Sequence, residues 1–252
     1  MSAGDTSGGG AYSRQNVLSI YLPAVTLAIG TGVLIPAIPI YARSFNIPFE
    51  VASLVIIVQQ LGSMCASLPT GLLADRFGRR RIVLAGPILL AISSFLAVTA
   101  QSFPELVAYR FIAGIGSQMW QIGRLTMIAD TGGDHERGKQ ITTMHSMEST
   151  GRLLSPVIGG FLAALWDVRA PFVVHAVLCL AAIAPSFKLV KETAPHLAPV
   201  AAGRQPQADA AGDGGFRALL TYPVMVLFAA QFCAFLTRGP MYAGQINLFA
   251  SG

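Results

Sequence analysis

The sequence is poor in charge, since only 12% of its 252 residues are Asp, Glu, Lys or Arg. A soluble globular domain carries about 25% charged residues, so an ordinary water-facing surface is excluded. Apolar residues make up 53% of the chain, and the mean hydropathy is +0.59. The few charges are clustered, which leaves apolar stretches of about the 20 residues that a membrane-spanning helix needs. The composition predicts an all-α membrane protein.

Cysteine is also scarce. Cys65, Cys179 and Cys233 all lie in apolar segments, without C-x-x-C spacing or a neighbouring group of histidines. A disulfide framework and a zinc site are therefore not expected. We expect no metal and no cofactor. The sequence has no nucleophile elbow and no phosphate-binding loop, so we do not expect an enzyme. The net charge of +5 comes without a basic patch interleaved with aromatics, and nucleic acid is not an expected partner.

Apolar segments predict the organisation of the chain. We expect a disordered cytoplasmic tail at 1–13, a six-helix transmembrane bundle at 14–190 and a cytoplasmic linker at 191–215. A seventh transmembrane helix at 216–252 would start an incomplete C-terminal bundle. The six helices of the bundle are expected at 17–41, 51–74, 82–100, 103–128, 140–165 and 171–190. Residues 130–139 are expected to form a charged, solvated turn.

Loop charges predict the orientation in the membrane, because cytoplasmic loops are enriched in Lys and Arg. Only two cations fall in the loops on one side, Arg43 and Arg169. The other side receives eleven cations, which are Arg14, Arg76, Arg79, Arg80, Arg81, Arg137, Lys139, Lys188, Lys191, Arg204 and Arg217. We therefore expect a multi-pass protein of the cell membrane with a cytoplasmic N-terminus.

The string from Gly71 to Arg81, GLLADRFGRRR, stands between the second and third predicted helices. Its positions of interest are Gly71, Asp75, Arg76, Gly78, Arg79 and Arg80. A tight turn needs a glycine where the backbone bends sharply, which Gly78 supplies. Gly71 would permit close helix contact, and Asp75 could accept a hydrogen bond from a helix N-terminus or pair with a cation.

This string resembles the signature loop of the major facilitator superfamily, whose loop takes part in the conformational switch. Three further motifs agree with this resemblance, and those of the first and fifth helices are similar to motifs of its drug:proton antiporters. The first-helix motif is carried by Gly30, Pro36 and Pro39, and the fourth-helix motif by Arg110, Gly114 and Gly116. The fifth-helix antiporter motif is carried by Gly151, Ser155, Pro156, Gly159 and Gly160, with serine at 155 where the family has glycine. The resemblance implies a six-helix N-terminal bundle of this superfamily and a role in proton coupling for Arg110.

The fifth predicted helix also has a physical reading of its own. Gly151, Ser155 and Gly159 are four residues apart and form one face with almost no side chain. Such a face lets helices approach closely in lipid, and Pro156 bends the helix by removing a backbone hydrogen bond. Ordinary helix packing would explain the same pattern.

Ionisable residues inside membrane helices cost at least about 2.5 kcal/mol on insertion scales and normally face a cavity or a partner. At a rise of 1.5 Å per residue, Glu148 and Arg124 lie roughly 12 Å and 9 Å from the same end of the bundle. We therefore predict that they can pair, with Arg152 as a competitor and Arg110 too distant. Glu148 is the candidate proton-binding residue, or else a structural ion pair. His145 is interpreted as a polar packing residue, with a proton relay as the alternative.

Gln60 and Gln121 are candidates for the lining of a substrate path. The resemblance implies secondary active transport, with proton-coupled efflux of a small amphipathic compound by alternating access as the leading hypothesis. The alternatives are a metabolite or sugar importer of the same superfamily, or a truncated fragment without transport activity. The expected partners are the lipid bilayer, the small-molecule substrate, protons as coupling ion and a second half-transporter.

Overall fold

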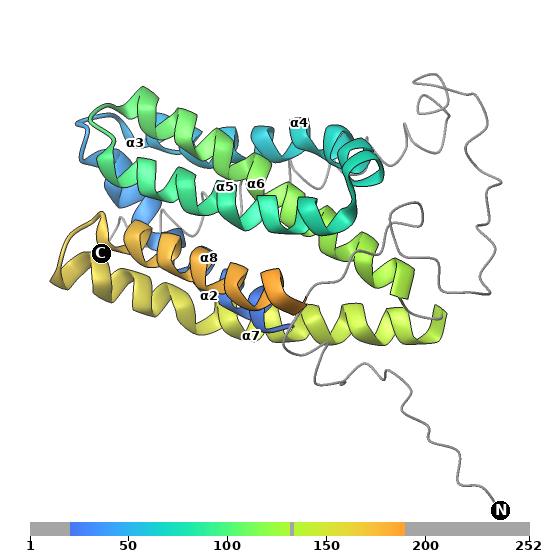
Figure 1. Cartoon of the computed structure of the whole chain (residues 1–252). Helices are drawn as coiled ribbons and strands as arrows, with labels where there is room; N and C mark the ends of the chain where they lie inside the picture. Colours follow the sequence, from blue (N-terminus) through green and yellow to red (C-terminus); the bar gives the residue numbers. More distant parts are fainter. Residues whose placement is uncertain (1–20, 132–133, 190–252) are drawn as a thin grey trace, which may run out of the picture. The chain divides into compact units, whose positions relative to one another are not determined.

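The computed structural model describes residues 21–131 and 134–189, all within the first of two compact units, Met1–Pro199. The described part consists of helices and their connections. Six of these helices are long, and the short α3 precedes α4 (Figure 1). The predicted tail at 1–13, the linker at 191–215 and the seventh helix at 216–252 lie outside the described residues. The helices are α2 (Leu22–Arg43), α3 (Phe49–Ala52), α4 (Leu54–Phe77), α5 (Arg79–Thr99), α6 (Phe103–Thr131), α7 (Asp134–Leu165) and α8 (Ala170–Leu189).

Each long helix overlaps one of the six predicted segments, and the differences lie at the ends. The charged stretch from Asp134 to Lys139, expected as a turn, forms the first turns of α7. That prediction was wrong because charged residues form helix readily once they continue an existing helical segment. Between α4 and α5 the chain turns at Gly78, whose φ of 95° is strained for any residue with a Cβ.

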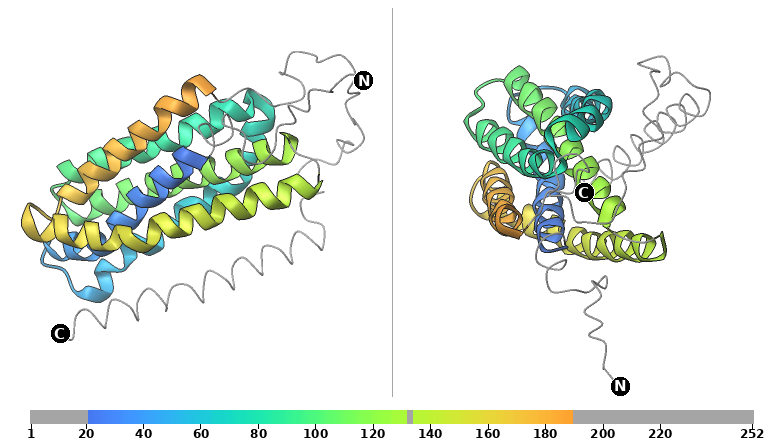
Figure 2. Two further views of the ribbon diagram at one scale, coloured as in Figure 1. Left: turned by 90° about the horizontal axis from the view of Figure 1, so that it is seen from below. Right: turned by 45° about the vertical axis from the view of Figure 1, so that its right-hand side comes forward.

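The six long helices form two triplets in chain order, and helices of each triplet pack mainly against helices of the other. In the first triplet (α2, α4, α5), α2 packs against α7 and α8; in the second (α6, α7, α8), α6 packs against α4 and α5. α5 also packs against α8. In space, α4, α5 and α6 lie together on one side and α2, α7 and α8 on the other (Figure 1), and Figure 2 shows the same helices from two further directions.

Small residues lie at the closest helix crossings. A Cβ added to Gly62 or Gly114 would collide with the backbone of the facing helix, at Phe111 and Gln59 respectively. The same holds for Gly86 of α5 against the backbone of α6 at Trp120. Close packing of this kind is how membrane helices associate, because lipid offers no hydrophobic driving force between them.

Four described helices are long and apolar enough to cross a membrane, namely α2, α4, α5 and the stretch Ala170–Phe187 of α8. The other two long helices, α6 and α7, carry the polar and charged residues expected in the bundle interior. Large apolar side chains also cover the outside of the bundle. On α7 the side chains of Leu153, Leu154, Val157 and Phe161 are each more than 60% exposed. Such a surface suits lipid or further helices rather than water.

Candidate functional site

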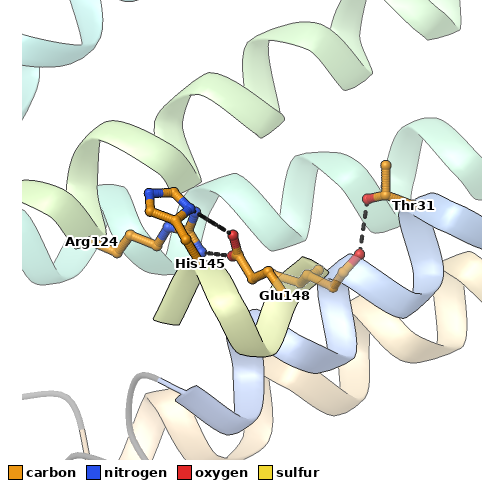
Figure 3. Close-up of polar contacts among 5 residues, drawn as sticks. Thr31, Arg124, His145 and Glu148 are labelled. Atoms are coloured by element: carbon orange, nitrogen blue, oxygen red, sulfur yellow. Dashed lines mark hydrogen bonds and ion pairs between the residues drawn. The ribbon is translucent and has the colours of Figure 1, made fainter. Parts of the chain in front are cut away.

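The structure brings Arg124 of α6 and Glu148 of α7 into direct contact. Arg124 Nη1 and Nη2 both donate to the carboxylate of Glu148, the latter to Oε2 at 3.3 Å (Figure 3). The side chains of Arg124 and Glu148 are only 4% and 5% exposed. A two-pronged guanidinium–carboxylate contact is among the strongest hydrogen-bonded pairs, and burial makes the loss of either partner costly.

His145 contacts the carboxylate of Glu148 from the solvent-exposed side of this group. Its Nδ1 lies 3.4 Å from Glu148 Oε2, and its side chain is 52% exposed. The two residues are three apart on α7, which places their side chains on one face of the helix. The carboxylate therefore lies between a buried cation and a half-exposed imidazole.

Trp120 packs against the pair one turn earlier on α6. Its ring centroid lies 5.4 Å from Arg124 Cζ, a cation–π distance. The Nε of Arg124 is buried and has no hydrogen-bond partner among the described residues. Arg124 is thus held by one carboxylate and one aromatic face, so its surroundings depend strongly on the charge of Glu148.

Arg110 occupies the other end of α6, fourteen residues and about 21 Å away from Arg124 along the helix. It is buried and donates through Nη2 to Gln59 of α4. Within the described part of the chain its Nε and Nη1 have no hydrogen-bond partner. As expected from its depth, Arg110 is not part of the Glu148 group.

Arg152 is exposed on α7, one turn beyond Glu148. No ion pair joins Arg152 to Glu148 in the described residues, where Glu148 instead contacts Arg124 and His145. The helical spacing allowed Arg152 to compete with Arg124 for Glu148. In this structure Arg152 does not do so. A cation at this depth needs water, an anion or a carboxylate nearby.

A second buried polar cluster was missed by sequence reasoning. His175 of α8 lies with its Nδ1 2.6 Å from Ser94 Oγ of α5, and Cys179 Sγ lies 3.6 Å from its Nε2. All three side chains are buried. The four-residue spacing of His175 and Cys179 was the one available signal, but Ser94 is 81 residues from His175 in sequence.

The signature loop is tied to the ends of two other helices. Arg79 Nη1 donates to the carbonyl oxygen of Thr126 at 3.1 Å, and Arg80 Nη2 to that of Phe187 at 2.8 Å. Asp75 lies 3.9 Å from Arg79 and is largely exposed. Arg76 is exposed, and an added Cβ at Gly71 would meet nothing within 4 Å among the described atoms. The close helix contact expected at Gly71 is therefore not found there.

The residues of the antiporter motif differ in how closely they pack against a neighbouring helix. A Cβ at Gly159 would collide with the carbonyl oxygen of Val33, and one at Gly151 would come within 3.2 Å of Ile29. Ser155 is buried and donates to the carbonyl oxygen of Gly151 at 2.8 Å. The small-residue face thus packs on α2. Gly160, in contrast, has nothing within 4 Å of an added Cβ in the described part.

The first-helix motif and the two glutamines occupy different places. Pro36 and Pro39 lie inside α2, and a Cβ at Gly30 would lie 3.0 Å from the ring of His175. Gln60 of α4 and Gln121 of α6 are both exposed on the bundle surface. Neither glutamine belongs to the Glu148 group.

Taken together, the helical architecture, the apolar exterior and the buried charges define a multi-pass membrane protein. The chain matches the family model described as Major Facilitator Superfamily over residues 20–250, and it belongs to that family. Among curated proteins it is 28% identical to the quinolone resistance protein NorA of Staphylococcus aureus over 179 residues. That match covers 71% of this chain and 46% of NorA, so the chain spans about half the length of this relative.

Solved structures of the family share the fold. The crystal structure of the human organic anion transporter MFSD10 matches with a TM-score of 0.60 at 22% identity, covering 71% of this chain and 48% of that one. A D-xylose-proton symporter matches with a TM-score of 0.59 at 20% identity, covering 72% and 49%. In both cases the similarity extends over about half of the solved chain.

Proposed function

We propose that this chain supplies the N-terminal half of a secondary active transporter that exports a small amphipathic compound in exchange for protons. The observation that carries the proposal is the buried pair of Arg124 and Glu148, with His145 at its exposed edge. A carboxylate alternately paired with a cation and protonated can couple proton binding to a change of conformation. The similarity to NorA, a quinolone resistance protein, supports export rather than uptake.

The proposed transporter works by alternating access between two six-helix bundles. In this arrangement the N-terminus and the linker at 191–215 are cytoplasmic, and residues 216–252 begin the second bundle. The whole transporter needs the rest of that second bundle. Arg110 and Arg152 take part in coupling, Gln60 and Gln121 line the substrate path, and the Gly71–Arg81 loop controls the conformational switch.

The test is gradient-driven efflux of a fluorescent amphipathic dye from cells or vesicles that contain this chain together with a complementary half. We expect Glu148→Gln to abolish efflux that depends on the proton gradient, because the amide cannot carry a proton. The matched control is Glu105→Gln, at the other end of the bundle, where the carboxylate accepts from Gln101 N and Ser102 Oγ. Unchanged rate and pH dependence in Glu148→Gln would refute the proposal. Acid-stimulated accumulation of substrate in the parent protein would indicate import instead.

A further inference from the structure

The carboxylate of Glu148 is enclosed, and this limits how a proton can reach it. Its side chain is 5% exposed, and the guanidinium of Arg124 closes one side of it. To exchange protons with water, a buried carboxylate needs a neighbouring side chain that touches both the carboxylate and water. That side chain must itself be able to gain and lose a proton. This inference rests on the proposed function, in which Glu148 carries the coupled proton.

His145 is that contact. It is the exposed member of the group, and its Nδ1 lies 3.4 Å from Glu148 Oε2. Figure 3 shows the second ring nitrogen directed away from the carboxylate. Imidazole is also the side chain whose charge ordinarily changes between about pH 5 and 8.

The other helices packed against this region offer no equivalent group among the described residues. α6 contributes the guanidinium of Arg124, which already pairs with Glu148. The buried side chain of Tyr21 lies just before α2, and Tyr41 and Arg43 lie at the other end of that helix. On α7 itself, the next charged side chain is Arg152, also a guanidinium.

The remaining neighbour, α8, has its titratable side chains occupied elsewhere. His175 and Cys179 contact each other, and His175 also contacts Ser94 of α5. On α2, Thr31 carries no titratable group, and its hydroxyl donates to the carbonyl oxygen of Leu27 at 2.9 Å. His145 is thus the proton-exchanging side chain placed on Glu148 within the described bundle.

We propose that His145 relays the coupled proton between water and Glu148. In release, the O–H bond of protonated Glu148 breaks and a N–H bond forms at Nδ1, which leaves a carboxylate and an imidazolium. The imidazolium then loses its Nε2 proton to water, and Arg124 pairs with the restored carboxylate. Exchange with water returns the exposed ring to its starting tautomer, and delivery follows the same steps in reverse.

The position of His145 indicates at which side of the membrane the relay operates. His145 lies one turn nearer than Glu148 to the beginning of α7. The signature loop lies at the end of the bundle where α6 finishes, since Arg79 binds the carbonyl oxygen of Thr126. In the proposed orientation this end is cytoplasmic, so His145 is the exit through which the coupled proton leaves Glu148 for the cytoplasm.

The fluorescence of Trp120 can be used to follow the protonation of Glu148 in this chain. The chain has two tryptophans, and Trp166→Phe removes the exposed one, which leaves Trp120 over Arg124. Protonation of Glu148 frees Arg124 and changes the fluorescence of Trp120. The experiment is a stopped-flow pH jump between pH 4 and pH 9 on this chain in lipid nanodiscs, with fluorescence followed in time.

We expect His145→Gln to keep the full end-point change in fluorescence but to slow it about a hundredfold, the lower range for loss of a proton-transfer group. Added imidazole should restore the rate. Ser149→Ala, an exposed neighbour on α7, is the matched control and should leave the rate unchanged. A parental rate in His145→Gln would overturn the relay, and so would loss of the end-point change without rescue by imidazole.

Glu148→Gln separates this inference from the function on which it rests. It should remove the fluorescence change altogether. If it does so while His145→Gln keeps the parental rate, the relay is wrong and Glu148 remains the proton site. If Glu148→Gln retains the change, or if the parent shows no change, the assignment of Glu148 fails and the proposed coupling fails with it.

Discussion

Two neighbouring glycines of α7 show how sharply single residues differ in this bundle. Gly159 packs against the backbone of α2, while no atom of the described residues lies within 4 Å of a Cβ added at Gly160. We predict that Gly159→Ala destabilises the bundle by about 1–3 kcal/mol, because the methyl group collides with the carbonyl oxygen of Val33 and the helices must separate.

Gly160→Ala is the matched control, since it adds the same methyl group one position along the same helix. It should be neutral or stabilising by less than about 1 kcal/mol, because alanine favours helix over glycine. Thermal unfolding of the two variants in the same detergent measures the difference. Equal melting temperatures would show that the contact between α2 and α7 is looser than described.

The four-residue spacing of Gly151, Ser155 and Gly159 was enough to predict a close-packed face. It could not identify α2 as the partner, because that depends on how the six helices are arranged. The pairing of Arg124 with Glu148 was predictable for a related reason. Both depths follow from helix rise alone, and an uncompensated charge in the membrane must find its nearest opposite charge.

His175 shows the limit of such reasoning. Its contact with Ser94 joins α8 to α5 across 81 residues of sequence, and serine in a membrane helix has many possible partners. No depth or charge rule singles out this pair, so only the packed structure reveals it. The exposure of His145 is a similar case, because α7 is covered mainly by α2 and leaves that part of its surface open.

Among the structural elements, the turn between α4 and α5 acts as a tether. Arg80 donates to the carbonyl oxygen of Phe187 near the end of α8, and its guanidinium carbon lies 5.7 Å from the Phe187 ring. A cation at the end of a helix also interacts favourably with its dipole. The turn therefore holds the last turn of α8 from a position 107 residues earlier in the chain.

We predict that Arg80→Ala makes amide hydrogen exchange in the last turn of α8 several-fold faster, because that turn loses its tether and opens more often. Arg81→Ala is the matched control, since Arg81 is the exposed next residue. Mass spectrometry of peptides covering Ala170–Leu189 measures both. Equal exchange in the two variants would mean that the contact does not hold α8.

The elements themselves were largely predictable, because long apolar segments in a membrane have few alternatives to helix. The beginning of α7 was not, since its first turns from Asp134 to Lys139 are charged and resemble a loop in composition. The short α3 and its separation from α4 at Ser53 also escaped prediction. Helix ends depend on local capping and on neighbours, which hydropathy does not register.

At the scale of the whole molecule, the charges at the two ends of the bundle should fix its orientation. The turn that begins α5 carries Arg79, Arg80 and Arg81, whereas the connection from α5 to α6 carries no cation. These two connections lie at opposite ends of α5. Because cations are retained on the cytoplasmic side, the α4–α5 turn should be cytoplasmic and the α5–α6 connection extracellular.

Cysteine labelling tests this orientation. In a background where Cys65 and Cys233 are replaced by serine and Cys179 by alanine, Gln101→Cys and Arg81→Cys each introduce one exposed thiol. We predict that a membrane-impermeant maleimide labels Gln101→Cys in sealed right-side-out vesicles, and Arg81→Cys only after permeabilisation. The reverse pattern would invert the topology. That outcome would place His145 at the outer face, where it would admit the coupled proton rather than release it.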